Sequence, residues 1–366
     1  MKLAWWRQIK AVIRLEVKKT FFARRGLWIY LLAAMPVLLF MAYAVAVSKQ
    51  QDRAAEMARH GDKAPTYQDL LAVKRGMTEK EVIATVGKPN VHFYWTEHRR
   101  TGPERIEDIL HEKYSYSDGP DSLTVEFLDG KVETVTMGEN NNLVRDSAMF
   151  AAVFQFFFLR LAIFFGCLGV FMNLFRGEIL DHSLHFYFLA PIRREVLMLG
   201  KFLAGLIATC SIFVTSEILQ TMAFLGAYGP GVRNLYLYHN HGLEHAAAYV
   251  GITVLACIGY GAFFLVAGIF FRNPIAPTAV ILIWEGINPF LPAVLKQFSV
   301  IYYLKSLCPV DVPVPPGTHP LLSLLIANPE PISAPVAVLG LLTVALVALY
   351  ISSLQVTRME INYTTE

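Results

Sequence analysis

Two long apolar runs, residues 150–174 and 202–225, most constrain what this chain can fold into, because a charged interval of residues 175–201 separates them. An α-helix needs about 20 predominantly apolar residues to cross a bilayer, and each run is long enough. Backbone polar groups must be satisfied internally in hydrocarbon, so the charged interval has to lie in water at one face of a membrane.

The charged interval is itself patterned as a helix. Leu180, Leu184 and Tyr187 recur at helical spacing, and Pro191 ends the run. One interpretation is that the charges only mark the membrane edge and set topology. The apolar side chains among them favour a short surface helix at residues 175–191 that contacts another protein. The candidate contact residues are Arg176, Glu178, Asp181, His182, Leu184, Tyr187, Pro191, Arg193 and Arg194.

Composition agrees with a multi-pass membrane protein. The 366 residues are 55% hydrophobic and 17% charged, whereas soluble domains carry about 25% charged residues. The net charge of +3 is too small and dispersed to indicate nucleic acid as a partner. The four cysteines form no CxxC pair, which argues against a zinc site or a disulfide framework.

The apolar runs predict an all-α bundle of six transmembrane helices. Their expected ranges are 26–48, 150–174, 202–225, 246–271, 275–295 and 335–354. Pro289 and Pro292 interrupt the fifth run near its end, and the apolar piece at 298–307 is too short to cross, which predicts a re-entrant or interfacial helix. Basic residues before the first run place both termini in the cytoplasm by the positive-inside rule.

Residues 3–22 predict an amphipathic helix. Trp6, Ile9 and Phe21 belong to an apolar stripe of helical period, beside a basic stripe that includes Arg7. Tryptophan next to basic residues suits a helix among lipid headgroups, so membrane lipids are an expected partner. A soluble, flexible tail is the alternative.

Residues 49–146 change sharply in composition, and the same topology places them outside the cytoplasm. Thr78 and Glu81 form a capping box that begins a helix, which Gly87 ends. Alternating residues on both sides of Asp129-Gly130 predict a β-hairpin, and Tyr114 with Tyr116 marks a third strand. We expect a small α+β domain inserted between residues 1–48, which hold the surface helix and first span, and the five spans of residues 147–366.

Three short runs in the insert carry a resemblance to a known family. RGMTEKEV at 75–82, VGKP at 86–89 and FLDGKV at 127–132 resemble the BamE/SmpA-type lipoprotein domain of the outer-membrane assembly machinery. The resemblance implies two helices against a three-stranded sheet. The lipid-bearing cysteine of those lipoproteins is absent, so their anchoring and partners do not carry over to this chain. The insert shows no set of nucleophile, base and orienting residue, which favours a recognition or gating module over an enzyme. Contact with a periplasmic partner is one of the roles open to it.

Three charged residues, Arg160, Glu217 and Glu285, lie inside the apolar runs, where charge is costly and usually paired. Arg160 and Glu217 fall at similar depth on neighbouring antiparallel helices, which predicts an ion pair, with Glu285 as competitor or third member. The pair would either hold the bundle together or take part in transport.

The other groups of polar residues do not indicate a metal site or a catalytic site. His239, His241, Glu244 and His245 fit no established zinc pattern, so a solvated loop is favoured and no metal is expected. Motifs of catalysis and the GxxxxGK[ST] phosphate loop are absent, which predicts that this chain is not an enzyme. If ATP drives it, a separate subunit binds the ATP.

The order of several runs resembles the type-2 ABC transporter permeases. After the basic N-terminal helix come GLWIYLL at 26–32, FRGEILD at 175–181, LAPIRR at 189–194 and RMEINY at 358–363. The resemblance implies that residues 175–191 form the coupling helix that docks on an ATP-binding subunit. It also implies an assembly of two permeases (a second copy or a paralogue) and two ATPases, and external re-entrant helices at 288–309.

The resemblance favours an exporter subunit in the bacterial inner membrane. The inserted domain at 49–146 departs from simple members of the family and leaves the cargo open. A non-transporting sensor or envelope-assembly protein, acting through that domain, is the rival hypothesis.

Overall fold

The computed structural model describes residues 2–21, 26–59, 67–89, 91–100, 106–117, 121–139, 143–180, 193–271, 273, 275–314 and 332–358. These residues are mostly helical and include one small antiparallel sheet. They divide into two compact units. The helical unit comprises Met1–Met41, Ser147–Leu225 and Asn234–Glu366, and the sheet unit comprises Ala42–Asp146 and Gly226–Arg233.

Five helices in the described residues are long and apolar enough to cross a membrane, so five of the six expected runs are confirmed as such. Their ranges are Leu27–Lys49, Asp146–Phe175, Arg194–Gly226, Gly242–Phe270 and Ala334–Arg358. The first lies in α2 (Leu27–Arg59), and the last three are α9, α11 and α16.

The second of these ranges is built from four helical segments. They are α5 (Leu143–Ala152), η2 (Val153–Ile163), α6 (Phe164–Phe171) and α7 (Asn173–Leu180). The segment η2 is a π-helix, a form that is rare at this length. Its backbone turn is wider than that of an α-helix, so its side chains point in directions that an α-helical count does not give.

The expected spanning helix over residues 275–295 is not confirmed. Helix α12 (Ile275–Ile287) has 13 residues, which span about 20 Å, short of the ~30 Å hydrocarbon core. It ends before Asn288-Pro289, because a proline disfavours the helical conformation in the residue that precedes it. The chain continues in short pieces, η3 (Asn288–Phe290), α13 (Ala293–Lys296) and α14 (Val300–Ser306). The expected short helix near residues 298–307 is therefore confirmed as α14.

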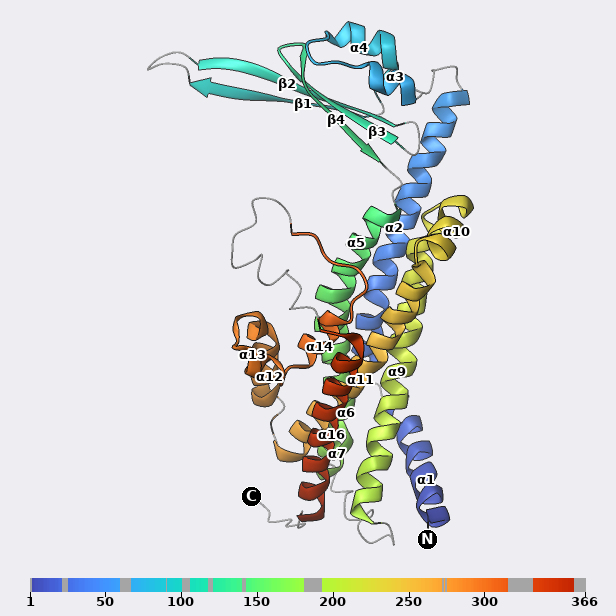
Figure 1. Ribbon diagram of the computed structural model, residues 1–366, viewed down its shortest axis with the longest axis vertical. Helices are drawn as coiled ribbons and strands as arrows, with labels where there is room; N and C mark the ends of the chain where they lie inside the picture. Colours follow the sequence, from blue (N-terminus) through green and yellow to red (C-terminus); the bar gives the residue numbers. More distant parts are fainter. Residues whose placement is uncertain are drawn as a thin grey trace. The chain divides into compact units, whose positions relative to one another are not determined.

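Helix α11 lies at the centre of the helical unit and packs against α16, α6 and η2 (Figure 1). Near its end, Gly268 lies so close to Met172 that a β-carbon would come within 2.7 Å of the Met172 carbonyl oxygen. The end of α16 lies at the same end of the unit, because Arg194 at the start of α9 donates a hydrogen bond to the Thr357 carbonyl oxygen. The chain between α11 and α16 therefore returns to the opposite end of the bundle.

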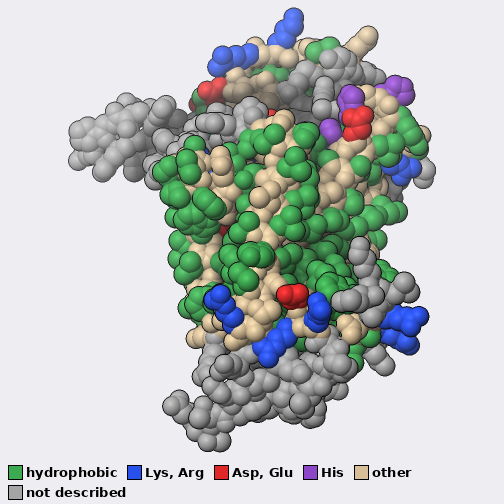
Figure 2. All heavy atoms as spheres, turned by 60° about the horizontal axis from the view of Figure 1, so that its bottom comes forward, with side chains coloured by type: hydrophobic (Ala, Val, Ile, Leu, Met, Phe, Trp, Pro, Cys, Tyr) green, Lys and Arg blue, Asp and Glu red, His purple; other side chains and the backbone are tan. Residues whose placement is uncertain are grey.

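The helical unit presents a broad hydrophobic surface with Lys and Arg side chains gathered along one border (Figure 2). The start of α9, the end of α16 and helix α1 (Lys2–Phe21) meet at one end of the unit. Exposed basic residues in these elements include Arg7, Lys10, Arg14, Lys19, Arg193 and Arg358. A hydrophobic belt with a basic border is typical of a membrane-embedded surface.

The sheet unit contains α3 (Tyr67–Ala72), α4 (Glu79–Val86) and four antiparallel strands in sequential order. The strands are β1 (Val91–Arg100), β2 (Ile106–Ser117), β3 (Asp121–Leu128) and β4 (Lys131–Glu139). A buried core that includes Leu70, Val82, Tyr114, Leu123 and Phe127 joins the helices to the sheet.

The local predictions for this unit are confirmed, and one strand was missed. Glu81 Oε2 accepts hydrogen bonds from the Thr78 backbone N–H at 2.8 Å and its hydroxyl at 2.9 Å, and Gly87 ends α4. Asp129 and Gly130 both have positive φ, 50° and 74°, as the two-residue β3–β4 turn requires. The sheet has four strands where three were expected, because β1 was not predicted.

Candidate functional site

The predicted coupling residues are only partly described. Asp181, His182, Leu184, Tyr187 and Pro191 lie outside the described residues. Arg176 and Glu178 belong to α7, but their side-chain environments are not described. Arg193 and Arg194, at the other end of the interval, are described in full, so the site is built here from the residues that border it.

Both arginines at the start of α9 reach other elements. The Arg193 guanidinium lies 5.1 Å from the centroid of the Trp5 ring in α1. The Arg194 Nη1 donates a hydrogen bond of 2.9 Å to the Thr357 carbonyl oxygen near the end of α16. The chain leaving the charged interval is thus attached to two further helices.

The Lys201 ammonium near this end contacts three other residues and was not among the site residues predicted from the sequence. Lys201 Nζ forms a 2.7 Å ion pair with Glu16 Oε1 of α1 and donates a 3.0 Å hydrogen bond to the Leu174 carbonyl oxygen of α7. It also lies 5.4 Å from the centroid of the Phe175 ring. Lys201 is fully buried and Glu16 is 2% exposed. We call Lys201, Glu16, Leu174 and Phe175 the Lys201 junction; it connects α1, α7 and α9.

The periodicity of α1 explains how Glu16 reaches this position. Ile9, Val12 and Glu16 are buried and recur at three- and four-residue spacing, so they share one helix face. Val12 packs against Gly200, where a β-carbon would come within 2.9 Å of the valine side chain. One turn after Val12, Glu16 meets Lys201, the neighbour of Gly200. One face of α1 is therefore packed against protein, while Trp6 on another face is 54% exposed.

The predicted Arg160–Glu217 ion pair is wrong. Glu217 is fully buried and accepts hydrogen bonds from Gln220 Nε2 and, at 3.1 Å, from Thr221 Oγ1, both on its own helix. The Arg160 guanidinium lies 5.3 Å from the centroid of the Phe156 ring and interacts electrostatically with Glu285. Equal depth does not fix the direction of a side chain around its helix axis, and the π-helix η2 changes that direction for Arg160.

Glu285 holds the short helix α14 in place. Its carboxylate accepts hydrogen bonds from Ser299 Oγ at 2.8 Å, from the Val300 N–H at 3.0 Å and from the Ile301 N–H at 2.8 Å. The first N–H groups of a helix have no partner within the helix, and they favour a negative charge. Glu285 thus fastens α14 to α12.

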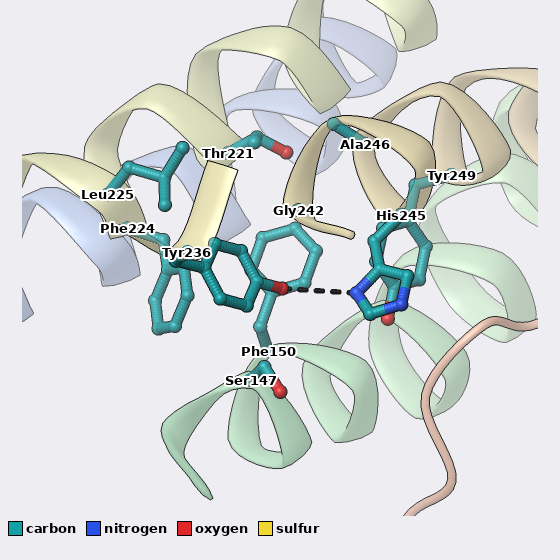
Figure 3. Close-up of a pocket in the computed structure, with 10 residues that line it drawn as sticks. All are labelled: Ser147, Phe150, Thr221, Phe224, Leu225, Tyr236, Gly242, His245, Ala246 and Tyr249. Carbon is teal, nitrogen blue, oxygen red and sulfur yellow. Dashed lines mark hydrogen bonds between the residues drawn. The ribbon is translucent and has the colours of Figure 1, made fainter. Parts of the chain in front are cut away.

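A small cavity lies at the other end of the helical unit, among α5, α9, α10 (Pro230–His239) and α11 (Figure 3). Its volume is about 20 Å³, enough for roughly one water molecule. It is lined by Ser147, Phe150, Thr221, Phe224, Leu225, Tyr236, Gly242, His245, Ala246 and Tyr249. The Tyr236 hydroxyl and His245 Nδ1 lie 3.3 Å apart in a hydrogen bond, and burial raises the pKa of Tyr236.

The histidine-rich loop is not assembled as a metal site. His241 Nδ1 lies 3.0 Å from Glu244 Oε2, and both side chains are exposed, whereas His245 turns to Tyr236. Among the described residues, no group of three or more His, Cys, Asp and Glu side chains could hold a metal ion.

A tyrosine in the sheet unit joins its two ends. The Tyr228 hydroxyl donates a 2.7 Å hydrogen bond to Asp146 Oδ2 and lies 3.3 Å from the Tyr43 hydroxyl. Burial, followed by these two contacts, raises the pKa of Tyr228. The polar link closes the unit where the chain enters it at Ala42 and leaves it at Asp146.

No protein-family model, no curated protein and no solved structure matches this chain. A proposal for its function therefore depends on the residues and their arrangement.

Proposed function

We propose that this chain is the permease subunit of an ATP-driven ABC transporter, which couples ATP hydrolysis in a separate subunit to export or to a mechanical signal. The ATP-binding subunit docks on the coupling helix at residues 175–191. A second permease, identical or paralogous, completes the assembly.

The observation that carries the proposal is the Lys201 junction. A force applied to the charged interval acts on α7 before it and on α9 after it. Lys201 ties the two helices together through the Leu174 carbonyl oxygen and adds α1 through Glu16. Arg194 adds α16 through the Thr357 carbonyl oxygen. The helices on both sides of residues 181–192 are thus bonded to each other and to α1 and α16, which would let a movement of the coupling helix reach all four helices.

The mechanism is a lever. Closure of the ATPase dimer displaces the coupling helix. The second long helix, which ends in α7, and α9 carry the displacement through the bundle as a rigid-body movement. Glu178, Asp181 and Arg193 orient the docked surfaces through complementary charge. The connected helices move together, because breaking the buried Glu16–Lys201 pair would leave an uncompensated charge.

The proposed topology has six crossings, with both termini in the cytoplasm and the sheet unit outside it, in a bacterial inner membrane. Five crossings use the long apolar helices. The chain between α11 and α16 makes the remaining one through α12 and the short helices η3, α13 and α14, held together by Glu285. The sheet unit acts as a BamE-like recognition or gating module.

The test is purification of the full-length protein from its native membranes in a mild detergent. We expect an ATPase with a GxxxxGK[ST] motif to co-purify in stoichiometric amount and to hydrolyse ATP. Reversing the charges in the double variant Glu178→Lys, Asp181→Lys should abolish the association. Glu133→Lys, an exposed reversal on β4, is the matched control and should retain it. A stable protein that carries no ATPase would contradict the proposal.

One observation favours the rival function, a sensor or envelope-assembly protein. Phe93, Tyr94 and Trp95 are 62%, 69% and 39% exposed on β1, a strand at the edge of the sheet. Exposed aromatic side chains on a free edge are typical of a protein-binding surface. A phenotype that is lost with Tyr94→Ser but persists without any ATPase would favour this second function.

A further inference from the structure

Glu217 is a buried carboxyl with neutral partners. Its side chain is fully buried, and Gln220 and Thr221 supply its hydrogen bonds. In the described part of the chain, no Lys, Arg or His nitrogen forms an ion pair with it. An ionised carboxylate without a charged partner is so costly in a low-dielectric interior that such a group takes up a proton instead. The hydrogen bonds of two neutral groups do not offset that cost.

Two unsatisfied polar atoms accompany this carboxyl. Gln220 Oε1 and the Tyr249 hydroxyl are buried and make no hydrogen bond to the described residues. Gln220 is bonded to Glu217, and Tyr249 interacts with it electrostatically from α11. Buried polar atoms normally have partners, so a missing donor or a water molecule is expected here.

The cavity of Figure 3 supplies a route from this cluster to the surface. Thr221, which donates to Glu217, lines the cavity, and so does Tyr249. The same space is also lined by Ser147, Tyr236 and the partly exposed His245. One water molecule in this volume would join the hydroxyl groups that line it into a hydrogen-bonded chain.

We propose that Glu217 is a proton-binding site that exchanges its proton with the surface beside His245 through this cavity. The carboxylate gains one proton to become a carboxylic acid, and the water and hydroxyl groups of the cavity pass it on without any redox change. This proposal does not depend on the ATP-driven function.

Among the described residues, few titratable groups face the site. Helix α11 contributes Tyr249 and His245, and α10 contributes Tyr236. Cys308 interacts with Tyr249, and His241 and Glu244 interact with His245. From α9 itself come only the neutral Gln220 and Thr221. Phe150 of α5 and Phe40 of α2 surround Phe224, one turn beyond Thr221. Arg160 of η2 is directed to Glu285 and Tyr260 instead.

Infrared difference spectroscopy on the full-length protein in lipid nanodiscs tests the proposal. At pH 7 we expect the C=O stretching band of a protonated carboxyl group that disappears in Glu217→Gln. Glu285→Gln is the matched control, because Glu285 is also a buried carboxyl but faces the Arg160 guanidinium and three hydrogen-bond donors. It should leave the band that belongs to Glu217 unchanged. Absence of the band in the unmodified protein, or its persistence in Glu217→Gln, would overturn the proposal.

Transfer of the protein into D₂O tests the route through the cavity. The C=O stretching band of Glu217 shifts as deuterium replaces the carboxyl proton. Ala246→Leu fills the cavity and should slow that shift about tenfold or more, since exchange would then depend on local opening of the helices. Ala247→Leu, on the exposed side of the same helix, should exchange as the unmodified protein does. Equal rates of hydrogen–deuterium exchange in the two variants would contradict proton exchange through the cavity. A protonated-carboxyl band that forms only after Na⁺ is removed would also contradict it, because Na⁺ rather than a proton would then occupy Glu217.

Discussion

Helix α9 has two polar sites with a buried carboxyl group, and the two groups differ in the charge of their partners. Near the start of the helix, Lys201 meets Glu16 as an ion pair, and both side chains are almost completely shielded from solvent. About 24 Å further along the helix, Glu217 has only an amide and a hydroxyl as partners. The ion pair joins α1 to α9. The neutral partners leave Glu217 free to gain or lose a proton, so a change in its protonation breaks no ion pair.

The largest effect is expected at the ion pair. Glu16→Gln removes the carboxylate that forms the ion pair with the buried Lys201 ammonium, which should lower the free energy of unfolding by about 3–5 kcal/mol in a denaturant titration of the purified protein. The double variant Glu16→Met, Lys201→Met should recover most of that loss, because no buried charge remains.

The exposed pair Lys113–Glu126 is the matched control for the ion pair. Its atoms are 2.9 Å apart, but the side chains are 42% and 40% exposed. Lys113→Met should therefore cost at most about 1 kcal/mol. Equal losses at the two pairs would show that burial does not distinguish them.

A smaller effect is expected at Glu285. Glu285→Gln keeps an acceptor for the α14 backbone but removes the charge that the Val300 and Ile301 N–H groups face. We expect a loss of about 1–2 kcal/mol and faster hydrogen exchange at these two amides, measured by mass spectrometry of the intact protein. Unchanged protection of α14 would mean that its packing alone holds it.

Glu217→Gln should change the free energy of unfolding by no more than about 0.5 kcal/mol at pH 7. An amide replaces a neutral carboxyl with similar shape and hydrogen-bonding capacity. The same denaturant titration measures it beside Glu16→Gln. A loss as large as that of Glu16→Gln would break the comparison, because it would mean that both carboxylates are ionised.

The smallest effect is expected at Glu81, the exposed carboxylate of the capping box. The hydrogen bonds from Thr78, first its backbone N–H and then its hydroxyl, lower the pKa of Glu81 below its usual value of 4.5. Its contribution is therefore present above pH 4.5 and disappears as the pH falls through the lowered pKa. Hydrogen-exchange protection of α4 should exceed that of Glu81→Gln at pH 7, and the two should converge in acid. A constant difference would contradict this assignment.

Features with local causes could be predicted from the sequence. The capping box at Thr78, the turn at Asp129-Gly130 and the long apolar helices each depend on residues close together in the chain. Pro289 also marks the end of α12, whereas the hydrophobicity of residues 275–295 by itself favours a longer helix. Strand β1 contains Phe93, Tyr94 and Trp95, which are residue types typical of strands. They are consecutive rather than alternating with polar residues, so the period-two pattern that predicted the hairpin strands is absent from β1.

The Lys201 junction could not be predicted from the sequence, because its contacts join residues far apart in the chain. Glu16 and Lys201 are 185 positions apart, and nothing near either residue identifies its partner. The depth of Arg160 could be estimated from a uniform rise per residue, but its direction depends on the π-helix. The contact surface proposed for Asp181, His182, Leu184, Tyr187 and Pro191 stays a prediction, because it lies outside the described residues.

The π-helix also affects how this protein tolerates change in length. Each hydrogen-bonded turn of a π-helix contains one more residue than a turn of an α-helix. Residues 153–163 therefore hold surplus residues within the second long helix. Deletion of one of them, for example Leu161 on the exposed side, could be absorbed by conversion of a π turn into an α turn. The same deletion in α9 would rotate every later side chain by about 100° and separate Glu217 from the cavity.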